Sequence, residues 1–220
     1  MRTTSTKKYM AALLLTLVVF SVGILIGINL EDARLADAKQ ITVNEKLNLL
    51  SLQLQQKYIE SGVECKSLNK LLENNIDDLA KKGATIIKYQ KNSVFSTNEF
   101  NAQLRDYFLT EIQFYLISKE IDTKCGNQNV KVIYFYNENE NDTQGVILDY
   151  LKKQFKEEVF IFSFNSQFTD EPMVGILLES YSIKEFPSVV VDEKVFQGHT
   201  DVRTLKDEIC KKLDSKHEEC

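Results

Sequence analysis

The sequence has no tryptophan, only two prolines and two histidines, and no cysteine pair in the spacing Cys-x-x-Cys. With two histidines and no cluster of cysteine and histidine, we expect no zinc site and no metal, because such sites draw on clustered ligands. The missing Cys-x-x-Cys removes the commonest redox dithiol. Both prolines, Pro172 and Pro187, lie in the last quarter of the chain, so none interrupts helices before that point. We also expect no cofactor.

Basic residues are also fewer than acidic residues. The chain has 32 Asp and Glu against 27 Lys and Arg, a formal net charge of −5 at pH 7. Surfaces that bind nucleic acid or anionic lipid carry an excess of positive charge. We therefore expect no nucleic-acid partner.

The N-terminal segment contains the longest apolar run. Residues 9–30 carry no charge and are rich in Leu, Val and Ile; three basic residues precede them and two acidic residues follow. About twenty helical residues cover roughly 30 Å, the thickness of a bilayer's hydrocarbon core. Because basic residues mark the cytoplasmic side of such helices, the sequence predicts a cytoplasmic N-terminus over residues 1–8 and a transmembrane helix over 9–30. The prediction is a single-pass protein of the cell membrane with extracytoplasmic C-terminal domains.

A cleaved signal peptide is the alternative for this segment. Residues 36–38 read Ala-Asp-Ala, the small-x-small pattern of a cleavage site. The apolar run is long for a signal peptide, however, and Glu31, Asp32 and Arg34 separate it from that pattern. These two features favour an uncleaved anchor.

Residues 31–127 have the pattern of helices. They contain no proline, and apolar residues recur at spacings of three and four, which is typical of amphipathic helices. We interpret three apolar stripes as mutually buried in an antiparallel helical hairpin or a short coiled coil. The alternative is a stalk that binds a partner or forms a homo-oligomer, with a first helix at about 41–61 pairing between chains. The stripes are Val43, Leu47, Leu50 and Leu54; Leu68, Leu71, Leu72, Ile76 and Leu79; and Phe100, Leu104, Tyr107, Phe108, Ile112 and Tyr115.

Four cysteines in a chain expected to be exported predict two disulfides. Cys65 begins the second stripe and Cys125 follows the third, and these ends are neighbours in an antiparallel hairpin. A Cys65–Cys125 bond would close a loop of about 60 residues, which stabilises by roughly 4 kcal/mol in the chain-entropy model. Cys210 and Cys220 would then form the second bond. Four cysteines permit three pairings, so the other two stay open.

The pattern changes again in residues 128–220, where short β-branched and aromatic runs alternate with helical spacing. The order is β-α-β-α-β-β-α, which indicates an α/β domain with crossovers and a final antiparallel hairpin. The strands are expected at about 130–136, 159–164, 187–191 and 195–198, and the helices at about 146–155, 172–181 and 201–213.

This element order, with Phe186-Pro187 directly before the third strand, resembles the thioredoxin-like superfamily over residues 130–213. The resemblance implies a cis peptide bond before Pro187. It also implies a groove beside that bond that receives an extended polypeptide, so Phe186, Pro187 and Ser188 are the expected protein-binding residues.

The family's reactive dithiol lies between the first strand and the following helix. By that resemblance Glu138 and Asn141 stand in the two cysteine positions, so no thiolate can form there. We interpret the carboxylates of Glu138, Glu140 and Asp142 as part of a solvated loop before the helix. A weak Ca²⁺ site is the alternative, although their spacing matches no calcium loop.

The expected function is therefore a thioredoxin-like module without catalytic residues that binds protein or peptide, as a chaperone-like or assembly subunit would. Whether the chain is an enzyme stays open, because Cys65 and Cys125 could serve as the redox pair of a thiol–disulfide oxidoreductase. A third hypothesis places the function in the helical region, as an oligomerising stalk.

Overall fold

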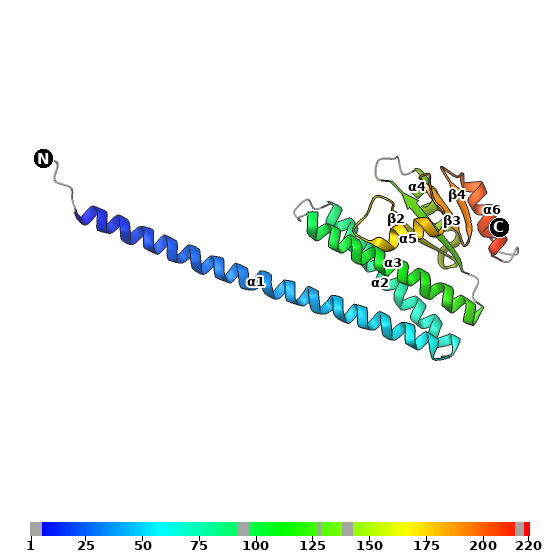
Figure 1. The fold of residues 1–220 in the computed structure, drawn as a ribbon, viewed down its shortest axis with the longest axis horizontal. Coiled ribbons are helices and arrows are strands. Elements are labelled where there is room, and N and C mark those ends of the chain that lie inside the picture. The colour runs from blue at the N-terminus through cyan, green and yellow to red at the C-terminus, as the bar shows by residue number, and fades with distance from the viewer. Residues whose placement is uncertain (1–5, 92–96, 127–128, 138–142, 214–217) are drawn as a thin grey trace. The chain divides into compact units, whose positions relative to one another are not determined.

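The computed structural model describes residues 6–91, 97–126, 129–137, 143–213 and 218–220. The chain divides into two units, one up to Lys57 and one from Tyr58 to Cys220, and each is described by itself. The elements, shown in Figure 1, are α1 (Thr6–Glu60), α2 (Cys65–Lys91), α3 (Thr97–Cys125), β1 (Val130–Tyr136), α4 (Thr143–Phe155), the 3-10 turn η1 (Lys156–Glu158), β2 (Val159–Asn165), α5 (Pro172–Ser180), β3 (Ser188–Val191), β4 (Lys194–Gln197) and α6 (Val202–Lys212).

The part of α1 up to Lys57 lies in the first unit, and it corrects the predicted fold class and localisation. A helix that spans a bilayer needs about twenty consecutive, mostly apolar residues. Over the residues that the structure describes, no helix meets the requirement of length and apolar character for crossing a membrane. The predicted membrane-spanning helix at residues 9–30, and with it the single-pass membrane localisation, is therefore contradicted.

The first apolar stripe also differs from the expectation of mutual burial. Leu47, Leu50 and Leu54 of α1 are exposed. All three belong to the unit that ends at Lys57. The side chain of Val43 lies outside the described residues.

The second and third stripes pack against each other in a hairpin of α2 and α3. Leu68 and Leu72 of α2 and Leu104 and Phe108 of α3 are buried in one cluster. Lys82 reaches across from α2, where its Nζ lies 2.9 Å from the Asp106 carboxylate. These contacts explain why two long helices fold back on each other.

The second unit also contains a four-stranded sheet in the order β2-β1-β3-β4. β1 pairs parallel with β2 and antiparallel with β3, and β4 continues antiparallel from β3. The element order and the strand order together are those of a thioredoxin-like fold. Ser188 at the start of β3 lies opposite Phe135 of β1 and Gln197 of β4.

Helices cover both faces of this sheet (Figure 1). Alternate residues of β1 point to opposite faces, so Ile133 and Phe135 join a core with α3 and α5, whereas Val132 and Tyr134 join a core with α4 and α6. The α3 side is rich in aromatic pairs: Phe108 lies 5.6 Å from Phe164 between ring centroids. The hairpin of α2 and α3 is thus part of the same folded unit as the sheet.

Two disulfides join Cys65 to Cys125 and Cys210 to Cys220. They match the pairing favoured from the sequence. The first links the start of α2 to the end of α3, and Lys124 beside it donates a 2.5 Å hydrogen bond to the carbonyl of Ile59. The disulfide therefore fastens the open end of the hairpin, and the hydrogen bond joins the same end of α3 to the last turn of α1.

Candidate functional site

The residues predicted from the thioredoxin resemblance lie at one end of the sheet, which we call the Pro187 end. It is where β1 ends and β3 begins. The Phe186–Pro187 peptide bond is cis, as the resemblance implied. Phe186 and Pro187 are half-buried, whereas Ser188 is fully buried and donates a 2.5 Å hydrogen bond from its Oγ to the carbonyl of Glu185. Ser188 therefore shapes the loop and does not offer its hydroxyl at the surface.

A side-chain amide on β4 fixes the loop before Pro187. Gln197 Oε1 accepts hydrogen bonds from the backbone N–H groups of Lys184, at 2.7 Å, and Glu185, at 3.1 Å. The next residue, Gly198, has φ = 76°, a conformation that residues with a Cβ seldom adopt. Gln197 was not predicted as a site residue, because its role depends on a tertiary contact.

The backbone of Phe186 differs from that of its neighbours. Lys184, Glu185 and Ser188 all have hydrogen bonds or ladder partners. No hydrogen bond joins the N–H or C=O of Phe186 to any other residue in the part of the chain that the structure describes. A donor and an acceptor on one residue are what an extended chain needs to pair as in a β-ladder.

The N-terminus of α4 belongs to the same end of the sheet. Gln144 is buried, and its Oε1 accepts a 2.8 Å hydrogen bond from the backbone N–H of Thr200. One turn further on, Val146 and Tyr150 are exposed apolar residues on one face of α4. Glu138 and Asn141, the positions of the missing dithiol, lie outside the described residues, as do Glu140 and Asp142.

The cysteines are not at the Pro187 end. Cys125 precedes β1, and Pro187 lies beside the end of that seven-residue strand. At about 3.3 Å per residue, the two ends of β1 are roughly 20 Å apart. All four cysteines are disulfide-bonded, so no thiol accompanies Pro187 among the described residues.

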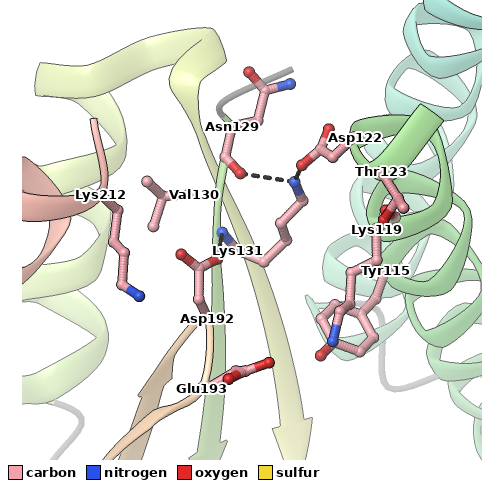
Figure 2. Close-up of a pocket in the computed structure, with 10 residues that line it drawn as sticks. All are labelled: Tyr115, Lys119, Asp122, Thr123, Asn129, Val130, Lys131, Asp192, Glu193 and Lys212. Carbon is pink, nitrogen blue, oxygen red and sulfur yellow. Dashed lines mark hydrogen bonds and ion pairs between the residues drawn. The ribbon is translucent and has the colours of Figure 1, made fainter. Parts of the chain in front are cut away.

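The opposite end of the sheet, which we call the Lys131 end, contains a cavity of about 500 Å³ that the sequence analysis did not single out. Figure 2 shows Lys131 at its centre, with Asp122 and Asn129 beside the ammonium group. Lys131 is 3% exposed. Its one hint in the sequence is a charge within the apolar run of β1.

A second unpredicted group is Glu111 of α3, which is buried against β2. Its Oε1 accepts hydrogen bonds from the Tyr107 hydroxyl, at 2.9 Å, and from the backbone N–H of Ser163, at 3.3 Å. Its Oε2 is buried without a partner among the described residues. Burial raises the pKa of Glu111 to about 8. Glu111 continues the 4-3-4 spacing of Leu104, Phe108 and Tyr115, and this position in the apolar stripe is its one hint of burial in the sequence.

Comparison with known proteins is limited to the fold. No protein-family model matches the chain, and no curated protein sequence does. Among solved structures, the chain is similar to the germline-specific thioredoxin Deadhead of Drosophila melanogaster, with 16% identity and a TM-score of 0.33 over 46% of this chain and 92% of that one. A malarial protein has 17% identity and a TM-score of 0.33, over 39% of this chain and 98% of that one. The thioredoxin-like assignment follows from the strand order and element order described above.

Proposed function

We propose that this chain is a non-catalytic thioredoxin-like module that binds an extended polypeptide at the Pro187 end. The observation that carries the proposal is the backbone of Phe186, whose N–H and C=O have no hydrogen bond to any described residue, in a loop that Gln197 otherwise fixes. An incoming strand would pair with that backbone, as in recognition by β-strand addition. Because the contacts are to the main chain, many sequences would be accepted, as suits a chaperone-like or assembly role.

The disulfides support the non-catalytic part of this proposal. Thiol–disulfide exchange requires a thiolate that can reach the bound chain. The four cysteines are paired, and Cys125 is about one strand length, roughly 20 Å, from Pro187. The module would therefore hold a polypeptide without attacking it.

The test is binding of a permanently unfolded polypeptide, reduced and carboxymethylated α-lactalbumin, to the full chain by fluorescence anisotropy. Gln197→Ala removes the two hydrogen bonds that fix the loop before Pro187. Their loss, about 1 kcal/mol, should weaken binding of the polypeptide about fivefold. Asn74→Ala, an exposed amide on α2, is the matched control and should bind like the unaltered chain.

The binding position can be read by photo-crosslinking. A photoreactive amino acid in place of the exposed Glu185 should form an adduct with the unfolded polypeptide, and one in place of the exposed Lys81 should not. Absence of binding, or equal loss in both amide variants, contradicts the proposal.

A thiol–disulfide oxidoreductase is the second candidate, and one observation favours it. Cys65 is exposed and is the first residue of the 27-residue helix α2. The N-terminus of a helix stabilises a thiolate. If this is the function, disulfide exchange will persist in Gln197→Ala and will be abolished by Cys65→Ser.

A further inference from the structure

The cavity at the Lys131 end lies between several elements that meet at the beginning of β1. Figure 2 shows α3 on one side, β1 and the β3–β4 turn behind, and the end of α6 opposite. Its volume of about 500 Å³ is within the range of pockets that bind small molecules. Its position, about one strand length from Pro187, separates it from the proposed polypeptide site.

The base of the cavity is held by contacts to Lys131. Its ammonium group pairs with the Asp122 carboxylate and donates a 2.7 Å hydrogen bond to the carbonyl of Asn129. Its backbone N–H donates to Asp192 Oδ1 at 3.1 Å, and its carbonyl accepts from the Asp192 N–H at 2.7 Å. These contacts keep Lys131 buried at the base of the cavity.

Around this base, side chains of both charges have no ion-pair partner among the described residues. The Lys119 ammonium lies 5.5 Å from the centre of the Tyr115 ring and has no carboxylate partner among the described residues. Lys212 of α6 likewise pairs with no described carboxylate. Glu193 in the β3–β4 turn is exposed without a described partner, and Asp122 Oδ1, on α3 like Lys119, is buried without one.

The charges that line the cavity therefore cancel, because it contains three lysines and three carboxylates. The lysines are Lys119, Lys131 and Lys212, and the carboxylates are those of Asp122, Asp192 and Glu193. A simple anion would meet repulsion from the carboxylates, and a simple cation would meet it from the lysines. A ligand with separated charges of both signs can pair with the exposed Lys119 and the exposed Glu193 at once.

We infer that this cavity binds a small zwitterion with an ammonium and a carboxylate group, of the size of a dipeptide. The carboxylate pairs with Lys119, the ammonium pairs with Glu193, and an apolar side chain contacts the ring of Tyr115. This site is separate from the proposed polypeptide-binding site, and neither depends on the other.

The experiment uses two dipeptides, dialanine and alanyl-phenylalanine, each in three forms, titrated into the full chain and followed by NMR. The free dipeptides should shift signals of residues around Lys131. N-acetylation removes the ammonium and C-amidation removes the carboxylate, so each blocked form should bind about tenfold more weakly, the effect of one charge-assisted pair.

Two variants assign each charge to its partner. In Lys119→Met, amidation of the dipeptide should no longer weaken binding, whereas acetylation still should. In Glu193→Gln, acetylation should no longer weaken binding, whereas amidation still should. Both residues lie near the surface and neither holds the Lys131 ion pair, so the fold is expected to persist. Lys81→Met and Glu179→Gln, exposed residues elsewhere, are the matched controls.

The inference is overturned if neither free dipeptide binds at millimolar concentration, or if free, acetylated and amidated forms bind alike. It is also overturned if the shifted signals lie at the Pro187 end. None of these results bears on binding of unfolded polypeptide by the Pro187 end, which is measured with a different probe and different variants.

Discussion

The two ends of the sheet differ in the chemistry that they offer. At the Pro187 end, the described contacts are neutral: an amide side chain fixes backbone N–H groups, and one residue keeps a free N–H and C=O. At the Lys131 end, a buried lysine, several carboxylates and the disulfide that closes the α2–α3 hairpin lie together. The first end follows from the topology of the fold, whereas the second depends on this chain's own side chains. The comparison therefore separates a feature of the fold from a feature of this chain's own side chains.

Among changes at the two ends of the sheet, removing a disulfide is expected to lower the free energy of unfolding the most. The Cys65–Cys125 bond spans 60 residues and the Cys210–Cys220 bond spans 10. In the chain-entropy model their removal lowers the free energy of unfolding by about 4 and about 3 kcal/mol. The double variants Cys65→Ser/Cys125→Ser and Cys210→Ser/Cys220→Ser, measured by denaturant unfolding, should differ in that order. Both double variants should still bind the unfolded polypeptide at the Pro187 end while they are folded. If only Cys65→Ser/Cys125→Ser lost this binding, the disulfide at the Lys131 end would be required for binding at the Pro187 end.

Replacing Lys131 tests whether the Lys131 end is built around its ion pair. Lys131→Met leaves Asp122 buried without its partner, and removing one member of such a pair costs about 3 kcal/mol, the low end of the usual range because Asp122 is 17% exposed. Lys153→Met breaks the exposed pair with Asp149 and should cost under about 1 kcal/mol. Equal costs in the two variants would show that the buried pair contributes no more than a surface pair.

The next effect is a pH dependence that arises between the two ends, at Glu111. Its pKa is raised by burial from 4.5 to about 8, so between these values the folded state keeps a proton that the unfolded state has lost. Stability is then full below about pH 4.5 and falls by up to about 1.4 kcal/mol per pH unit as the pH rises towards 8. Glu111→Gln should remove this slope in unfolding measured across the pH range. Identical slopes in the two proteins would show that Glu111 does not titrate in this window.

The smallest effect on stability is expected at the Pro187 end itself. Gln197 is exposed and its two hydrogen bonds join a surface loop, so Gln197→Ala should lower the free energy of unfolding by only about 1 kcal/mol. The same change should weaken binding of the unfolded polypeptide about fivefold. A large loss of stability with unchanged binding would make Gln197 a structural residue alone.

The sequence was sufficient where local pattern decides structure. The switch from helical spacing to β-branched runs located the α/β domain, and the thioredoxin resemblance placed the cis peptide bond at Phe186-Pro187. The cysteine positions, set at the two ends of a hairpin, favoured the pairing that the structure shows.

Where tertiary packing decides, the sequence was insufficient or misleading. The uncharged run of residues 9–30 suggested a membrane span that the described residues do not support. Gln197 and Glu111 owe their roles to groups far away in the chain, at Lys184 and at Ser163. Whether a polar residue in an apolar pattern is exposed or held by a distant partner cannot be derived from its spacing.

The most direct test of the central claim, a binding module without redox catalysis, is the state of Cys65 and Cys125 over a graded series of dithiol buffers. Thiols are alkylated at once and the bonds are mapped by mass spectrometry on the full chain. A structural bond stays oxidised throughout the range of thioredoxins and glutaredoxins, about −270 to −200 mV, and is reduced only below about −300 mV. Our account predicts that result for Cys65–Cys125. Half-reduction within the range of those oxidoreductases would contradict it and make the exposed Cys65 the centre of a redox function.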